Sequence, residues 1–280
     1  MKLEPVNYQD PHAPEQFVAC LREYGFGVLT QHPLAQTQIE SIYQNWLAFF
    51  KTEDKYQYRF KKGCMDGYFP PDVSETAKGY DIKDIKEYFH FYHPWGCCPD
   101  SLRDELLAYR DAANQVAETL LGWVETYSPP HIAKHYSEPL SAMIADSNQT
   151  LLRVLHYPPM TGNENPEAFR AAAHEDINLL TILPSANEPG LQVQLKDGSW
   201  LDVPCDTGYL IVNIGDMLQE ASSGYFPSTT HRVLMPPPER QNRSRLALPL
   251  FLHPRPGVVL SKRYTADSYL KERLRELGVA

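Results

Sequence analysis

The chain has 280 residues, enough for one large domain or two small ones, and 42% of the residues are hydrophobic. Together with 22% charged residues, this composition is typical of globular proteins and excludes collagen-like, coiled-coil and low-complexity chains. No apolar run approaches the roughly 18 residues of a membrane-spanning helix, and residues 1–5 contain no signal-peptide core, so we expect a cytoplasmic protein.

The formal net charge of the chain is −9 at pH 7. Binding to nucleic acid needs a basic stripe on the protein surface, so the acidic balance favours a small molecule as the partner, and neither nucleic acid nor a membrane is expected. The five cysteines include no CxxC pair and form no even-spaced framework, which argues against a disulfide scaffold and a cysteine zinc site. Nothing in the sequence indicates an oligomeric state.

Two helices are predicted in the first half of the chain. Apolar residues recur at steps of three and four over residues 38–50, and a longer helical pattern begins near Ser101 and ends before Pro129. Between them, residues 63–95 mix glycine, proline, aromatic and charged residues, which is typical of loops with short strands. A segment of this kind can cover a pocket.

From about residue 150 the sequence changes to short β-rich runs separated by turn signals. These runs cover residues 151–157, 179–183, 191–195, 201–204, 209–214, 231–235 and 246–251. Many short strands at this spacing indicate a sandwich or barrel. We therefore expect a mainly β fold with flanking helices, in which a β-barrel or jelly-roll core at 146–255 follows a helical and loop part at 1–145. A C-terminal helix within 256–280 completes a single domain of residues 1–280.

His174 and Asp176 lie two residues apart, directly before a predicted strand. In extended backbone such residues point to the same side, so both side chains can bind one ligand. Given 10 histidines and 35 acidic residues, roughly one such pair arises by chance, so a third ligand is required. His231 supplies it at the start of another β-rich run. Two imidazoles and one carboxylate on one face of an octahedral metal leave three open positions, which is typical of non-haem Fe(II) oxygenases.

Arg245 begins an otherwise apolar run that is predicted as a core strand. A guanidinium that points inward from this run needs an anionic partner, because an unpaired buried charge is very costly. Its planar fork fits a carboxylate at two points. A dicarboxylate that chelates the metal at one end and pairs with Arg245 at the other satisfies both features, and 2-oxoglutarate is such a molecule.

Several short segments occur in an order and spacing that match a known family. They are Gly25-Phe26-Gly27, Phe49-Phe50, Asp84-Ile85-Lys86-Glu87, Tyr157-Pro158-Pro159, His174-Glu175-Asp176, Gly190-Leu191-Gln192-Val193, Gly215-Asp216-Met217 and His231-Arg232-Val233. Through these segments the sequence resembles, over nearly its whole length, the 2-oxoglutarate and Fe(II)-dependent dioxygenases. Within them it is similar to the isopenicillin N synthase-like branch, which is also called the iron/ascorbate-dependent oxidoreductases. The resemblance implies a double-stranded β-helix, or jelly-roll, core.

The resemblance also implies a site and a reaction. His174, Asp176 and His231 would bind Fe(II), and Arg245 would hold the distal carboxylate of the cosubstrate 2-oxoglutarate. With O2, such an enzyme oxidises an unactivated C–H bond of a small molecule by hydroxylation, desaturation or cyclisation, and it releases succinate and CO2. The protein places the reactants and excludes water from the oxidant.

The sequence departs from the family pattern next to this arginine. Ala247 stands where the family has a serine whose hydroxyl hydrogen-bonds the cosubstrate. Strand alternation places Ser244 on the face opposite Arg245, so Tyr157 is the remaining hydroxyl near the cosubstrate. For Arg153, contact with a substrate carboxylate and a structural ion pair both stay open.

Two other functions also stay open. Relatives of the same fold use Fe(II) without 2-oxoglutarate and take electrons from the substrate or from ascorbate, and the missing serine hydroxyl is compatible with that chemistry. A non-catalytic small-molecule binding module is the third hypothesis. The sequence does not identify the substrate, because the loops that select it differ freely on one fold.

Overall fold

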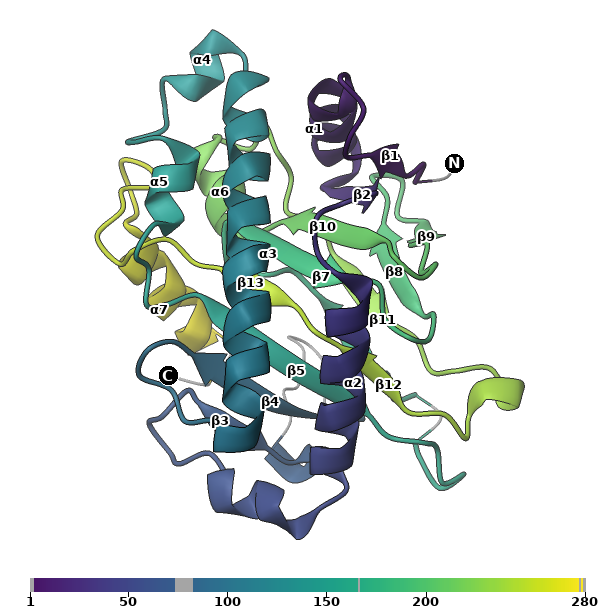
Figure 1. The fold of residues 1–280 in the computed structure, drawn as a ribbon. Helices are drawn as coiled ribbons and strands as arrows, with labels where there is room; N and C mark the ends of the chain where they lie inside the picture. Colours follow the sequence, from purple (N-terminus) through teal and green to yellow (C-terminus); the bar gives the residue numbers. More distant parts are fainter. Residues whose placement is uncertain (1–2, 74–82, 166, 277, 279–280) are drawn as a thin grey trace.

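The computed structural model of the chain describes residues 3–73, 83–165, 167–276 and 278 (Figure 1). Residues 74–82, which belong to the segment predicted to cover a pocket, lie outside the described residues. The same holds for residues 277, 279 and 280 at the end of the predicted C-terminal helix. Within the described ranges, no helix is both long enough and apolar enough to cross a membrane.

Two β-sheets form the centre of the described structure. The larger sheet has nine strands within the described ranges, with β1, β2, β10, β7, β13, β5, β4 and β3 in spatial order and β12 also paired with β5. Its strands are β1 (Val6–Asn7), β2 (Phe26–Thr30), β3 (Gly67–Phe69), β4 (Glu87–Tyr92), β5 (Leu151–Tyr157), β7 (Leu180–Pro184), β10 (Leu210–Ile214), β12 (Arg245–Ala247) and β13 (Leu250–Leu252). The smaller sheet contains β6 (Ala171–His174), β11 (His231–Val233), β8 (Leu191–Gln194) and β9 (Trp200–Asp202).

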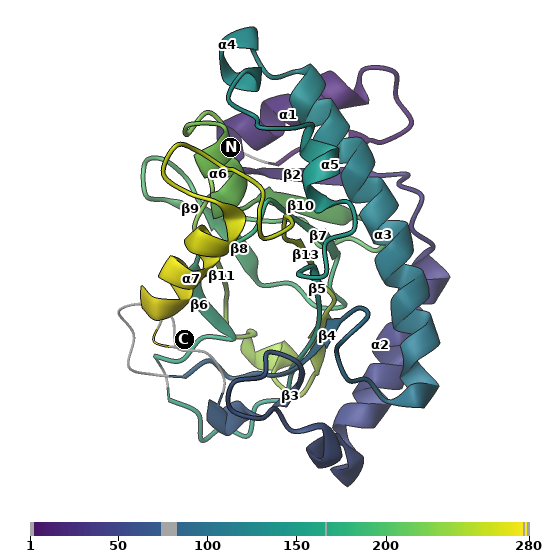
Figure 2. The same ribbon diagram turned by 90° about the vertical axis from the view of Figure 1, so that its left-hand side faces the viewer.

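Helices flank the two sheets. They are α1 (Ala13–Tyr24), α2 (Gln36–Phe50), α3 (Asp100–Thr126), α4 (Pro130–Ala133), α5 (Leu140–Ile144), α6 (Asp216–Ala221) and α7 (Ala266–Glu276). Figure 2 shows α2 and α3 along one side of this sheet and the strands of the smaller sheet on the other side. This arrangement confirms the predicted mainly β fold with flanking helices.

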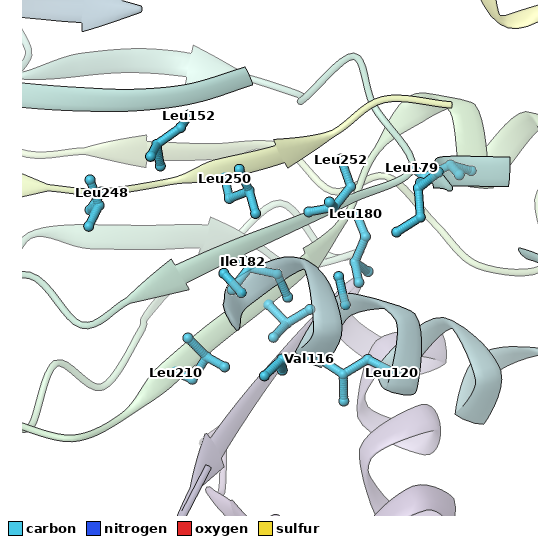
Figure 3. Close-up of a cluster of buried hydrophobic side chains, with 14 of the residues drawn as sticks. Val116, Leu120, Leu152, Leu179, Leu180, Ile182, Leu210, Leu248, Leu250 and Leu252 are labelled. Carbon is cyan, nitrogen blue, oxygen red and sulfur yellow. The ribbon is translucent and has the colours of Figure 1, made fainter. Parts of the chain in front are cut away.

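Strand alternation gives the two faces of the larger sheet different surroundings. On β5, Leu152 and Val154 are buried in the main hydrophobic core, whereas Arg153, Leu155 and Tyr157 line a cavity between the sheets. The other central strands follow the same rule, and Figure 3 shows their leucine and isoleucine side chains gathered against α3. One face of the sheet is therefore a hydrophobic core, and the opposite face holds the cavity.

Leu250→Ala is expected to destabilise the protein by about 3 kcal/mol. Leu250 on β13 is fully buried in the core that α3 covers, and truncating its side chain leaves a cavity there. The free energy of unfolding, measured by urea denaturation, checks this value. Val259→Ala is the control, since Val259 is 48% exposed and its truncation should cost less than about 0.5 kcal/mol. A loss below about 1 kcal/mol for Leu250→Ala would contradict the described packing.

The predicted elements agree with the structure where a long periodic pattern was present. The helix predicted over 38–50 is α2, the one beginning near Ser101 is α3, and the run 151–157 is β5. The single run predicted over 246–251 is instead two strands, β12 and β13, because Pro249 has no N–H to donate to the sheet. The N-terminal part also supplies strands β1 to β4, so residues 1–145 are more than helices and loops.

Candidate active site

Backbone pairing between two short strands places two histidines side by side. His174 ends β6, His231 begins β11, and the two residues are direct partners in the antiparallel register. Their ring centroids are 4.4 Å apart. Asp176 follows β6 by two residues, so its carboxylate lies beside the same pair of rings.

The three side chains offer one donor atom each to a common point. Asp176 Oδ1 lies 4.0 Å from His174 Nε2 and 3.7 Å from His231 Nε2. All three donor atoms lie within 4.8 Å of one another, and no other group of this kind exists within the described ranges. The structure therefore brings together the three residues that the sequence singles out.

Each histidine is oriented by a backbone carbonyl. Nδ1 of His174 lies 2.7 Å from the carbonyl oxygen of Ala172, and Nδ1 of His231 lies 3.1 Å from that of Thr229. A carbonyl oxygen can only accept, so each Nδ1 carries the hydrogen and donates it. The Nε2 lone pairs are then left to face the carboxylate, which is the arrangement found in histidine metal ligands.

Asp176 is buried and uses its two oxygens differently. Oδ2 accepts hydrogen bonds from Thr181 Oγ1 at 2.6 Å and Asn213 Nδ2 at 2.8 Å, and Oδ1 faces the histidines. Burial acts to raise the pKa of Asp176, but the two histidines and these two hydrogen bonds outweigh it and hold the pKa below its usual value. An ionised carboxylate oxygen and two imidazole nitrogens fit a divalent iron in the three-ligand arrangement.

Asn213→Leu is expected to weaken Fe(II) binding about tenfold, because Asp176 loses one of the two donors that fix its orientation. An anaerobic Fe(II) titration checks this effect. Asn114→Leu on α3 is the control, since the Asn114 side chain donates to Glu118 at the surface, and its loss should leave iron affinity unchanged. Equal iron affinity in the Asn213 variant and the wild type would show that this bond does not orient the carboxylate.

A cavity, open to solvent at its mouth, extends from the three residues toward Arg245. Arg245 is 3% exposed, and its Nε donates to the backbone carbonyl of Glu188 at 2.9 Å. Its Nη1 is buried without a hydrogen-bond partner in the described part of the chain. A buried, unpartnered guanidinium nitrogen at a cavity wall fits the distal carboxylate of 2-oxoglutarate.

The side chains around Arg245 hold it in position, but they offer few further hydrogen-bond donors to a carboxylate. Tyr157 pairs with Arg245 across β5 and β12, and its ring centroid lies 5.1 Å from the guanidinium carbon. Ala247, two residues along β12, lines the cavity with a methyl group. Ser244 Oγ lies 3.0 Å from His156 Nε2, and His156 is not among the residues that line the cavity. The serine therefore cannot replace the hydroxyl that position 247 lacks.

Arg153 also lines the cavity, on the same strand face as Tyr157. Its Nε donates to His90 Nε2 at 2.7 Å, and its guanidinium lies over the rings of Tyr88 and Phe251 at 4.7 and 5.3 Å. A stacked guanidinium at a cavity wall suits recognition of a planar anionic group. Arg153 can therefore keep these contacts within the fold and still face a ligand in the cavity.

Sequence reasoning missed two residues that touch Asp176 and one next to Arg245. Thr181 and Asn213 face each other across β7 and β10, and a polar residue inside the apolar run 209–214 was the available signal for Asn213. Arg170 is 1% exposed, and its guanidinium carbon lies 5.8 Å from the ring centroid of Tyr157. Nothing in its local sequence indicates that position.

Two family models match the chain. The model of the 2OG-Fe(II) oxygenase superfamily matches residues 148–254, which hold the three candidate ligands and Arg245. A model described as the N-terminal part of the non-haem dioxygenases in morphine synthesis matches residues 3–115. Both halves of the chain thus resemble parts of the same class of enzyme.

Three individual proteins show how close the similarity is. Gibberellin 2-beta-dioxygenase 1 from Pisum sativum is 38% identical over 242 residues, which cover 82% of this chain and 71% of that protein. A candidate oxygenase from Shewanella oneidensis with a known crystal structure is 60% identical in sequence to this chain. The similarity covers the full length of both chains, and the TM-score is 0.91. A candidate 2OG-Fe(II) oxygenase family protein from Caulobacter crescentus is 31% identical, covers 98% of this chain and 99% of its own, and has a TM-score of 0.82.

These similarities agree with the jelly-roll fold and with the donor set between the two sheets. The chain therefore belongs to the 2-oxoglutarate and Fe(II)-dependent oxygenases, and it is a non-haem dioxygenase with iron as its metal and 2-oxoglutarate as its cosubstrate.

Proposed function

We propose that this dioxygenase oxidises an unactivated C–H bond of a small molecule, by hydroxylation, desaturation or cyclisation, with release of succinate and CO2. In this proposal His174, Asp176 and His231 hold the Fe(II). The observation that carries the proposal is the convergence of three oriented donor atoms at one end of a cavity whose other end offers an unpartnered guanidinium nitrogen.

When bound, Fe(II) and 2-oxoglutarate supply the oxidising chemistry, in which the cosubstrate is decarboxylated while O2 is reduced. The chain's own residues do the rest. His174, Asp176 and His231 would hold the metal through one donor atom each and would leave its other positions to reactants, and Asp176 would offset part of the metal charge. Phe26, Leu191 and Val233 line the cavity with apolar surface, which limits water around the reacting atoms.

Arg245 and Tyr157 are proposed to bind the cosubstrate. The Nη1 of Arg245 provides a charged donor for the distal carboxylate, and the Tyr157 side chain lines the same wall of the cavity. Arg153 is proposed to bind an anionic group of the substrate, because it also lines the cavity and its guanidinium lies over the Tyr88 ring. Hydrogen bonds to charged groups give such contacts both affinity and orientation.

We further propose that residues 1–280 act as one catalytic domain, since β2 of the N-terminal part pairs with β10 of the core. All five cysteines are free, which suits a reducing compartment such as the cytoplasm. The similarity to gibberellin 2-beta-dioxygenase 1 supports a small organic molecule as the substrate class. The reaction type and the individual substrate follow from the loops around the cavity, which differ freely between members of one fold.

The test is a screen of a metabolite library for compounds that stimulate succinate formation by the Fe(II)-loaded protein, with O2 consumption measured in parallel. One succinate formed for each O2 consumed, together with an oxidised product, is the expected result. Substrate oxidation with O2 consumption but without succinate would contradict the proposal.

A further inference from the structure

Arg170 is a second buried guanidinium near Arg245 that the proposed function leaves unused. It directly precedes β6 and is 1% exposed. Its Nη2 donates to the backbone carbonyl of Arg243 at 3.1 Å, and its Nε is buried without a hydrogen-bond partner in the ranges that the structure describes. Arg170 is not among the residues that line the cavity. Arg170 therefore makes no direct contact with a ligand in the cavity, and it can act on one only through its neighbours or through its charge.

Tyr157 connects Arg170 to the cavity. The ring centroid of Tyr157 lies 5.1 Å from the guanidinium carbon of Arg245 and 5.8 Å from that of Arg170. Both distances are within the range of cation–π contacts. Arg170 also holds the carbonyl of Arg243, two residues before Arg245. It thus restrains both residues that are proposed to meet the cosubstrate.

Among the residues that the structure describes, no ion pair balances the charge of Arg170 or Arg245. Glu188 lies near Arg170, but its carboxylate already pairs with Arg240 at 2.6 Å and with Arg243 at 3.2 Å. No acidic residue within the described ranges forms an ion pair with Arg170 or Arg245. Burial, and then the charge of Arg245, lower the pKa of Arg170 to about 10, so it remains protonated at neutral pH.

Two buried like charges without a counter-ion destabilise a fold, and an anion bound beside them removes much of that cost. The cavity wall near Arg245 is otherwise largely apolar, with Leu155, Leu183 and Ala247 as lining residues. A carboxylate bound at this wall meets few hydrogen-bond donors. The positive charges of Arg245 and Arg170 therefore contribute to its binding.

We propose that Arg170 is a positioning residue for the distal carboxylate of 2-oxoglutarate. It fixes the Tyr157 ring and the chain leading into β12, and it supplies the second positive charge that the carboxylate neutralises. This inference rests on the proposed function, in which that carboxylate binds to Arg245.

The test is calorimetric binding of 2-oxoglutarate to the Mn(II)-loaded protein, which requires no turnover. Arg170→Met is expected to raise the Kd of 2-oxoglutarate about tenfold, because one charge and one restraint on Arg245 are lost. The Kd of pyruvate, a 2-oxoacid without a second carboxylate, should stay unchanged. The melting temperature of the ligand-free protein should not fall, since the substitution removes a buried charge.

Arg110→Met is the matched control, because Arg110 on α3 also has a buried Nε without a partner among the described residues. It should leave the Kd of 2-oxoglutarate unchanged. Ala247→Ser, combined with Arg170→Met, should recover part of the lost affinity, since residue 247 lies on the same strand face as Arg245. Should Arg170→Met fail to fold, Arg170→Lys and Arg170→Gln make the comparison, and only the lysine variant should stay near the wild-type affinity.

Equal affinity for 2-oxoglutarate with and without the charge at position 170 would overturn the proposal. A parallel loss of affinity for pyruvate, together with a lower melting temperature, would also overturn it, because a purely structural role produces that pattern. These outcomes require a wild type that binds 2-oxoglutarate. A wild type without that affinity would instead contradict the proposed function, and the role of Arg170 would fall with it.

Discussion

Replacing Asp176 with alanine is expected to abolish turnover and to leave the protein without stably bound Fe(II). The carboxylate is the one anionic donor of the three, and its loss also removes the charge that offsets the metal. The loss should exceed the roughly 10- to 100-fold effect of removing a hydrogen bond outside the ligand set. Metal analysis after anaerobic reconstitution, together with succinate formation, measures both effects.

Glu175→Gln is the matched control for this substitution. Glu175 is the adjacent acidic residue, but its exposed carboxylate accepts a hydrogen bond from Thr230 and is not part of the donor group. Glutamine keeps an oxygen that can accept the same bond. The control should retain its iron and its activity. Wild-type iron content and turnover in Asp176→Ala would refute the proposed ligand set.

Arg245→Met is expected to raise the KM for 2-oxoglutarate about 100-fold, while turnover at saturating cosubstrate stays close to the wild-type value. Loss of hydrogen bonds to the charged carboxylate costs about 3 kcal/mol, which corresponds to that factor. The effect should fall on KM because the distal carboxylate is bound in the same way before and during the reaction. Steady-state succinate formation at varied 2-oxoglutarate concentration measures the two constants separately.

Arg263→Met provides the comparison, because the Arg263 side chain is 74% exposed and belongs to the C-terminal part of the chain. This variant should match the wild type in both constants. If Arg245→Met lowers turnover with an unchanged KM, or changes neither constant, the cosubstrate carboxylate does not bind at Arg245. The first of these two results would point to a role for Arg245 in the reaction itself.

Local sequence patterns were sufficient for the parts of the fold with a strong period. The steps of three and four in α2 reflect one buried face, and β5 is a β-rich run bounded by turn signals, so both can be read without knowing the neighbours. Strand β6 was missed because Ala171 and Ala172 carry little β preference. Strand β2 forms from a short segment whose position becomes clear only when β10 pairs with it.

Part of the candidate site could likewise be predicted from the sequence, and part of it could not. His174 and Asp176 are close in sequence, and a recognisable order of motifs linked them to His231. The contacts of Asp176 depend instead on register, since Thr181 and Asn213 meet only because β7 and β10 are neighbours. Neighbour order in a sheet is not contained in the pattern of any single strand.

The most direct test of the account is an anaerobic titration of the wild-type protein with Fe(II) and 2-oxoglutarate, followed by visible absorption. A metal-to-ligand charge-transfer band should develop only after both additions, and Asp176→Ala should never develop it. In Arg245→Met the same band should need a much higher cosubstrate concentration. A wild type that takes up no Fe(II), or an undiminished band after loss of the Asp176 carboxylate, would contradict the account.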